Sequence, residues 1–119
     1  MIRVSFLEVV FYKTSTGTEP VREWLKELPK QSKKLIGEDI KIVQYGWPIG
    51  MPVVRKLEKD IWEVRTNLAE GVARVLFTVQ LNDIVLLHGF IKKTRKTPLP
   101  DLKLARSRLR DIKGDDDEK

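Results

Sequence analysis

The chain contains no cysteine and a single histidine, His88. Without cysteine there can be no disulfide, no thiolate nucleophile and no cysteine-based zinc site. The acidic residues 115–118 stand without a second cluster of ligands, so they do not indicate a metal site either. No glycine-rich loop opens a predicted helix, which argues against phosphate binding by backbone amides. We therefore expect no metal and no other cofactor.

Long apolar runs are also missing. The N-terminal run is interrupted at Glu8, is too short for a secretory signal and lacks a small-residue cleavage site. No other segment approaches the length of a membrane span, so we expect a cytoplasmic protein without a membrane partner. A chain of 119 residues has room for one core. We expect a single domain over residues 1–113 and an acidic, disordered tail at 114–119.

Positive charge is abundant and unevenly distributed. The net charge is +6 and the sequence pI is about 9.7, values that favour a polyanionic partner. Residues 92–110 alone contain eight basic side chains against one acidic side chain, Asp101. A run of charge is usually a solvated face. Here the charges are concentrated in one stretch, which favours a surface that binds phosphate.

Hydrophobic periodicity predicts the element order β-α-α-β-β-β-α. A strand over residues 4–12 precedes a helix that begins near Pro20 and ends before Pro29. A second helix begins near Gln31 and ends at residues 46–48. The residues of these two helices that are spaced to face a core are Val21, Trp24, Leu25, Leu28, Ile36, Ile40, Val43 and Trp47.

Three further strands are predicted over residues 60–66, 72–79 and 84–91. Their short connections contain turn residues, so we expect an antiparallel meander. A closing helix should begin at Thr97–Pro98 and end at Gly114, with Leu102, Ala105, Leu109 and Ile112 facing the core. This order predicts the α+β class, with an antiparallel sheet whose helices pack on one face. The other face would be free for a binding site.

Two arginines fall on the predicted free face of the meander. Arg74 and Arg65 each alternate with apolar residues of their own strand. If the hairpin is centred on residues 69–70, the two arginines lie directly opposite one another. Such a pair is destabilising unless an anion, or a carboxylate such as Glu63, lies nearby. A phosphate ligand would meet this need, and surface ion pairs with Glu63 or Glu58 are the alternative.

The basic segment from Lys92 to Lys96 links the last strand to the final helix and could close a pocket around these arginines. Arginine keeps its proton in proteins, so it can only hold a phosphate or stabilise developing charge. A lysine crowded by other cations loses its proton more readily and could serve as general base or acid. His88 alternates with core residues, which favours a hydrogen-bonded structural histidine over a catalytic one.

Three stretches of the chain resemble a known family. Residues 56–65 (KLEKDIWEVR), 74–77 (RVLF) and 86–98 (LLHGFIKKTRKTP) are similar to the phage-derived HigB branch of the RelE toxin superfamily. The element order agrees over about residues 4–112. The resemblance implies a microbial ribonuclease fold and ribosome-dependent cleavage of messenger RNA, in which the 2′-hydroxyl attacks the adjacent phosphate without a metal.

The same resemblance implies a partner and a set of site residues. The partner would be a helix-turn-helix, HigA-like antitoxin, and the toxin would be a monomer alone or part of a heteromeric complex with it. By position, the family's basic strand residues and C-terminal basic segment correspond to Arg65, Arg74 and residues 92–96. We predict catalytic roles for Arg65, Arg74, Lys93 and Lys96, and RNA contacts for Lys92, Arg95, Arg55 and Lys56.

Some points stay open at this stage. The resemblance does not identify the general base. We consider Lys93 and Lys96 better candidates for this role than His88. Several RelE proteins stack a tyrosine of the last helix on a base, whereas residues 97–113 contain no aromatic residue, so base orientation would come from elsewhere. Two alternatives to a ribonuclease stay open, because positive charge alone supports both. The protein could be a nucleic-acid-binding module without catalysis, or a subunit that binds an acidic protein partner.

Overall fold

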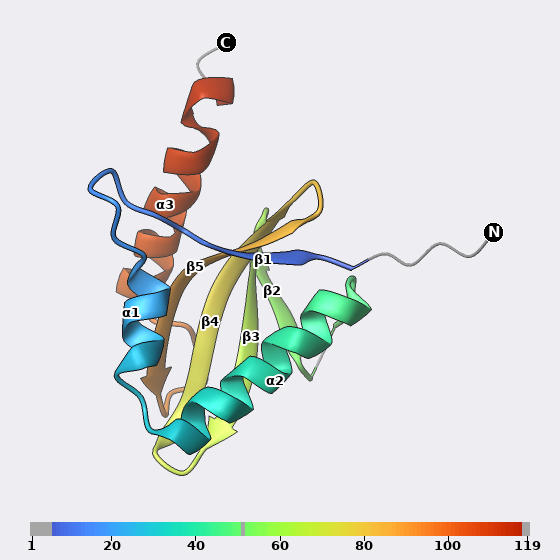
Figure 1. Cartoon of the computed structure of the whole chain (residues 1–119), viewed down its shortest axis with the longest axis vertical. Helices are drawn as coiled ribbons and strands as arrows, with labels where there is room; N and C mark the ends of the chain where they lie inside the picture. The colour runs from blue at the N-terminus through green and yellow to red at the C-terminus, as the bar shows by residue number, and fades with distance from the viewer. Residues whose placement is uncertain (1–5, 51, 118–119) are drawn as a thin grey trace, which may run out of the picture.

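The computed structural model describes residues 6–50 and 52–117 (Figure 1). Within these ranges the chain forms five strands and three helices, and the α+β class predicted from the sequence is confirmed. The elements are β1 (Glu8–Phe11), α1 (Pro20–Lys26), α2 (Lys30–Gly46), β2 (Val54–Glu58), β3 (Ile61–Leu68), β4 (Gly71–Gln80), β5 (Asp83–Lys92) and α3 (Leu99–Asp117).

The five strands form one mixed sheet in the order β1-β5-β4-β3-β2. β1 runs parallel to β5, and the other neighbours are antiparallel, so the expectation of an antiparallel sheet is wrong for β1. The predicted meander is confirmed, since β3, β4 and β5 each begin and end within two residues of the expected bounds. β1 is shorter than expected and exposes Glu8 and Val10, because it lies at an edge of the sheet; residues 4 and 5 lie outside the described residues.

The sequence does not predict β2, which forms the other edge of the sheet. Arg55 and Lys56 are both exposed, so this strand lacks the apolar alternation that identifies a half-buried strand. Adjacent charges of this kind protect an edge strand from pairing with other chains. The turn into β3 is completed by Asp60, whose φ of 65° lies in the left-handed region that aspartate tolerates.

One core lies between the sheet and the first two helices. The residues that we expected to face a core from α1 and α2 do so, together with Val64, Ala73, Val75, Phe77, Ile84 and Leu86 from the sheet. α1 lies very close to β5 at Gly89, where an added Cβ would be 2.4 Å from two ring atoms of Trp24. Glycine is therefore needed at this position for the helix to reach the sheet.

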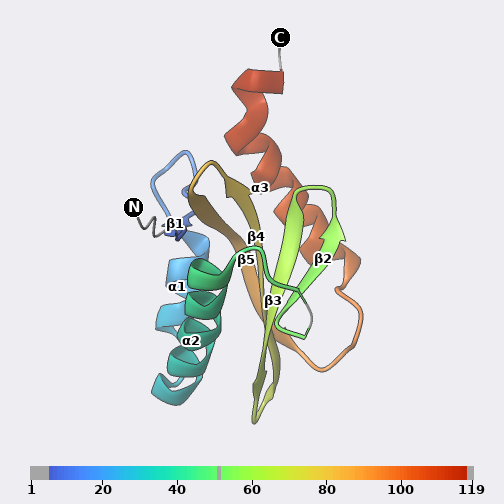
Figure 2. The ribbon, with the colours of Figure 1, turned by 90° about the vertical axis from the view of Figure 1, so that its right-hand side faces the viewer.

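A second core lies on the opposite face, under α3. Leu102, Ala105, Leu109 and Ile112 of α3 pack there against Tyr12, Ile61, Leu76, Val85, Leu87 and Phe90. Figure 2 shows the sheet between α1 and α2 on one side and α3 on the other. The expectation that all helices share one face is therefore wrong. Apolar side chains on both faces of β4 and β5 require cover on both sides.

α3 also continues past its predicted end, since the helix includes Gly114 and extends to Asp117. Residues 118 and 119 of the predicted tail lie outside the described residues. Among the helices of the described ranges, none is long and apolar enough to span a membrane.

Candidate active site

The β3–β4 hairpin places Arg65 directly opposite Arg74, in the register that the sequence predicts. Both lie on the face that α3 covers in part. Glu63 is on the same face, and its Oε1 lies 3.7 Å from Nε of Arg65. The carboxylate that two opposed arginines need is thus present in the chain. The other candidate carboxylate, Glu58, binds Arg106 instead.

Arg74 is completely buried, with 0% of its surface exposed. Its Nη1 donates to the backbone carbonyl of Lys96 at 2.8 Å, and its guanidinium carbon lies 5.9 Å from the centre of the Phe90 ring. Burial lowers the pKa of Arg74, and the nearby carboxylate of Glu63 opposes this effect. The expectation that strand alternation sends both arginines away from a core is therefore wrong for Arg74. It holds the basic segment in place from beneath.

Glu63 is buried as deeply as Arg74. Its Oε2 accepts a hydrogen bond of 2.7 Å from the hydroxyl of Thr97, which comes from the segment before α3. Among the described residues, Glu63 Oε1 and Arg74 Nε and Nη2 have no hydrogen-bond partner. Burying a charged group is costly unless its polar atoms have hydrogen-bond partners. The stability of the fold should therefore be sensitive to changes around Glu63 and Arg74.

The basic segment after β5 lies over this buried pair. Besides the contact with Lys96, Nη2 of Arg65 donates to the carbonyl of Arg95 at 3.5 Å. The predicted convergence on one surface is thus confirmed in part: both arginines share a face and contact the backbone of this segment, but Arg74 is not part of the surface. The side chains of Arg95 and Lys96 are exposed, and the side chain of Arg65 keeps 25% of its surface accessible.

Lys93 is directed differently from its neighbours. A Cβ added at Gly71 would lie 3.5 Å from Cγ of Lys93 and 3.2 Å from Cγ2 of Ile91. Ile91 packs against the core under α1 and α2. The stem of Lys93 therefore lies toward that side of the sheet, away from Arg74.

Arg55 and Lys56 separate in the same way, because successive residues of a strand face opposite sides. Arg55 is opposite Glu63, on the α3 side, and its charge contributes to lowering the pKa of Arg74. Lys56 is opposite Trp62, with its Nζ 5.8 Å from the ring centre, and Trp62 packs on the α1 and α2 side. Of these two predicted RNA contacts, the structure brings only Arg55 to the arginines.

A β-bulge in β5 directs His88 to the arginine side. Leu76 pairs with His88, but Phe77 pairs with Leu86, so Leu87 is an extra residue without a partner in the ladder. Unbroken alternation from Leu86 would turn His88 toward α1. The bulge turns it toward α3 instead.

His88 is hydrogen-bonded there, as the sequence predicts. Its Nε2 lies 2.6 Å from Oδ1 of Asp101, and Oδ2 of Asp101 accepts from Nζ of Lys92 at 3.2 Å. Burial lowers the pKa of His88, while the hydrogen bond and charge of Asp101 raise it and the charges of Arg108 and Lys92 lower it. The sequence analysis does not identify this partner. The signal was present, because Asp101 is the single acidic residue in the run from Lys92 to Arg110.

Part of the basic run in α3 serves the fold. Arg106 makes a bidentate contact with Glu58, with N···O distances of 2.8 and 2.9 Å. Arg108 donates to the carbonyl of Leu87, the bulge residue, at 2.7 Å. Lys113 binds Asp60 at 2.6 Å. These contacts fasten α3 to the sheet, so the charge available to a polyanion is concentrated at the start of the run.

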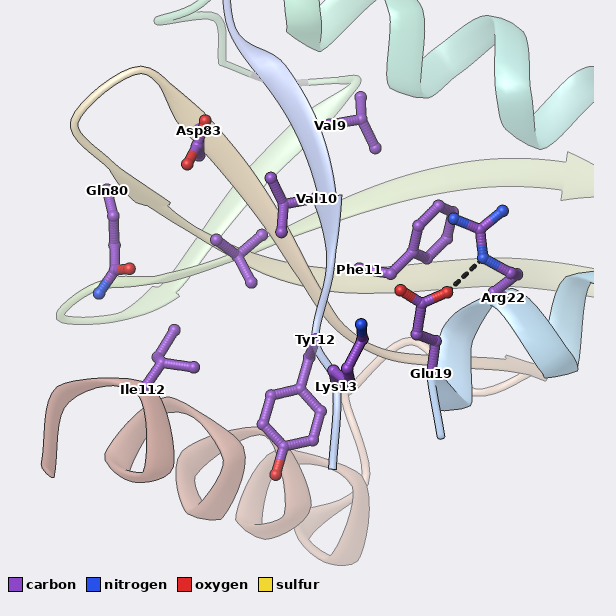
Figure 3. Close-up of a pocket in the computed structure, with 11 residues that line it drawn as sticks. Val9, Val10, Phe11, Tyr12, Lys13, Glu19, Arg22, Gln80, Asp83 and Ile112 are labelled. Atoms are coloured by element: carbon purple, nitrogen blue, oxygen red, sulfur yellow. Dashed lines mark hydrogen bonds and ion pairs between the residues drawn. The ribbon is translucent and has the colours of Figure 1, made fainter. Parts of the chain in front are cut away.

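A separate cavity of about 560 Å³ lies beside β1, between α1 and α3. Figure 3 shows Tyr12 and Ile112 on its α3 side and the ion pair of Glu19 with Arg22 on its α1 side. None of the predicted site residues lines it. The basic face beside α3 is the better candidate for the chemistry, because both arginines and His88 lie on that face of the sheet.

Among residues 6–50 and 52–117, no three histidine, aspartate or glutamate side chains gather as a metal site would require. Residues 23–110 match the model of a family described as Phage derived protein Gp49-like (DUF891), more than half of the chain. The chain belongs to this family. The Gp49-like family is associated with toxin–antitoxin systems and is part of the RelE/HigB-type toxin group. The resemblance seen in the sequence is therefore confirmed at the level of this group. A search of curated proteins finds no match.

Proposed function

We propose that this Gp49-like chain is the toxin of a type II toxin–antitoxin system and cleaves messenger RNA on the ribosome. Membership of a toxin–antitoxin-associated family supports the first part. The second part rests on one observation: Arg65, Arg55 and the basic segment that Arg74 holds share one face of the sheet. The implied partners are translated messenger RNA and a helix-turn-helix, HigA-like antitoxin.

The reaction we propose is an internal transfer at phosphorus. The 2′-oxygen of the RNA forms a bond to the adjacent phosphorus, and the bond from phosphorus to the 5′-oxygen breaks. The proton of the 2′-hydroxyl leaves, and the 5′-oxygen gains a proton. The products are a 2′,3′-cyclic phosphate and a 5′-hydroxyl. Because the substrate supplies its own nucleophile, the protein needs to orient the chain, move protons and stabilise charge, and we propose that it does so without a metal.

The accessible and buried arginines suit different parts of this reaction. Arg65 is partly exposed, so it can bind the phosphate and stabilise the charge that develops there. Arg55, Lys92, Arg95 and Lys96 are exposed around it and can neutralise flanking phosphates. Arg74 is buried and acts through the carbonyl of Lys96, so we assign it a positioning role rather than contact with RNA. Lys93 and Lys56 are directed elsewhere.

The test uses the purified protein with ribosomes and a translated message, followed by mapping of the RNA ends. Wild-type protein should produce cyclic phosphate ends. Arg65→Ala should lower the cleavage rate about 100- to 1,000-fold, as loss of a preorganised charge stabiliser does. Absence of cleavage by the wild-type chain, or an unchanged rate in Arg65→Ala, would contradict the proposal.

Arg55 and Lys56 provide a matched pair for the binding surface. They are adjacent, both exposed, and on opposite faces of β2. Arg55→Ala should weaken ribosome or RNA binding and reduce its salt dependence, because one phosphate contact is lost. Lys56→Ala removes the same charge from the protein and should change neither. Equal effects of the two substitutions would indicate a response to net charge and not to this face.

A further inference from the structure

We propose that His88, oriented by Asp101, is the residue that transfers protons in this reaction, and that Asp101 is its positioning residue. The inference rests on the proposed ribonuclease function. It differs from the expectation that a lysine of the basic segment serves as base. The observations that support it are the direction of His88 and its contact with Asp101, from which the roles of the two ring nitrogens follow.

The direction of His88 is set by the bulge at Leu87. The bulge places His88 on the face that carries Arg65 and Arg74, next to Phe90, whose ring stacks on the imidazole with centroids 5.4 Å apart. Bulges frequently occur where a strand must aim a side chain at a site. The side chain of His88 keeps 15% of its surface accessible, so the imidazole is held firmly but is not sealed from a ligand.

The contact with Asp101 fixes which nitrogen is available. An ionised carboxylate can only accept a hydrogen bond, so Nε2 of His88 carries the hydrogen that it donates to Oδ1. In the neutral ring, Nδ1 then holds the free lone pair and can accept a proton. Once the ring is protonated, the carboxylate stabilises the positive charge, which is the role that an orienting acid plays for histidine bases in general.

The charged groups around His88 come from two elements. Asp101 and Arg108 face it from α3, and Lys92 lies four residues further along β5, also bound to Asp101. On β4 its direct partner is the apolar Leu76. Burial lowers the pKa of His88 and keeps the ring neutral near pH 7, as a general base requires. Asp101 occupies the first turn of α3, where a negative charge is also favoured by the helix dipole.

Asp111 offers a control within the same helix. It joins α3 to the residue that follows β1, by accepting a hydrogen bond of 2.5 Å from the hydroxyl of Tyr12, and no contact with His88 is present among the described residues. If Asp101 only fastens α3 to the sheet, Asp101→Asn and Asp111→Asn should have similar consequences. If Asp101 orients a base, only Asp101→Asn should change the pH profile of cleavage.

The experiment measures single-turnover cleavage on ribosomes between about pH 5 and 9 for four proteins: wild type, His88→Gln, Asp101→Asn and Asp111→Asn. We expect His88→Gln to lose about 100- to 10,000-fold in rate, the usual contribution of a general base, with ribosome binding retained. In Asp101→Asn the acidic limb of the profile should move to lower pH, because the carboxylate that raises the pKa of His88 is gone. Asp111→Asn should keep the wild-type profile.

Rescue distinguishes chemistry from folding. Added imidazole should restore part of the activity of His88→Ala but none of the activity of Arg65→Ala. Wild-type cleavage together with an unchanged rate in His88→Gln, or equal profile shifts in Asp101→Asn and Asp111→Asn, would overturn this inference and leave the ribonuclease function intact. Absence of wild-type cleavage would overturn the function itself.

Discussion

Replacing Arg74 should lower the stability of the protein and disturb the basic segment that Arg74 binds, even though Arg74 is not exposed to solvent. Its side chain is fully buried, as is the carboxylate of Glu63, whose charge favours the protonated guanidinium. Among the described residues, the side chain of Arg74 makes one hydrogen bond, to the carbonyl of Lys96. Arg74→Met keeps an elongated apolar side chain but removes the charge. Glu63 would then be left in the interior with Thr97 as its hydrogen-bond donor and Arg65 as the neighbouring positive charge.

The expected cost follows from that geometry. Removing one of two interacting buried charges typically destabilises a protein by about 3–5 kcal/mol. Here the loss would come from the favourable charge interaction between Arg74 and Glu63 and from the hydrogen bond to Lys96, while Arg65 would remain 3.7 Å from Glu63. Domains of this size are stable by only about 5–15 kcal/mol. We therefore expect Arg74→Met to lose about a fifth or more of the free energy of unfolding. The double variant Glu63→Gln/Arg74→Met should lose less than the sum of the two single variants, since no unpaired charge remains.

Urea denaturation followed by circular dichroism measures this directly. With a slope of about 1–3 kcal/mol per molar urea, the midpoint for Arg74→Met should fall by at least about 1 M. Arg22→Met is the control, because that side chain is 50% exposed and should change stability by no more than about 0.5 kcal/mol. A loss below about 1 kcal/mol in Arg74→Met, or a double variant as unstable as the sum, would refute the reasoning.

Other predictions concern stability and cofactors. Gly89→Ala should lower the urea midpoint by an amount equivalent to about 1–3 kcal/mol, because its Cβ would overlap the Trp24 ring; a neutral effect would contradict the close packing of α1. Arg108→Leu should cost about 1.5–3 kcal/mol in the same assay, through the lost charged hydrogen bond to the bulge carbonyl of Leu87. Burial depresses the folded-state pKa of His88 below its unfolded value, so the unfolded chain takes up the proton first and stability should decline as the pH drops below about 6.5. The His88→Gln variant should lack that decline in stability. If the decline persists in this variant, groups other than His88 cause it. Cleavage should continue in a chelator of transition metals at a magnesium level that keeps ribosomes intact, and its loss would reveal a metal requirement.

The sequence could predict what depends on local periodicity. Alternation and hairpin length were enough to place Arg65 opposite Arg74, because the side-chain period of two and the turn together determine the register. The stripe of α3 was also predictable from its 3.6-residue period. The sequence could not predict the side of the sheet on which α3 packs. An apolar stripe identifies which residues of a helix are buried, but it does not identify the face of the sheet that they pack against. The continuous apolar residues 84–87 in β5 were the available sign that both faces need cover.

The finer organisation of the site depends on features without a sequence period. β2 is an edge strand whose exposed Arg55 and Lys56 hide its alternation. The bulge at Leu87 appears in the sequence only as two adjacent leucines, and it reverses the face assigned to His88. The burial of Arg74 follows from the course of the segment around Lys96, a tertiary arrangement that propensity and spacing do not contain.

The bulge has a consequence for how β5 can change in length. β5 contains two alternating patterns that are out of phase by one residue: Ile84 and Leu86 face α1 and α2, whereas His88 and Phe90 face α3. Leu87, the bulge residue, separates the two alternating patterns. An insertion or deletion of one residue at Leu87 would change only the bulge, so the side chains before and after it would keep their present faces of the sheet. The same change one or two residues later would turn Phe90 toward Trp24 and rotate every following side chain of the strand to the wrong face.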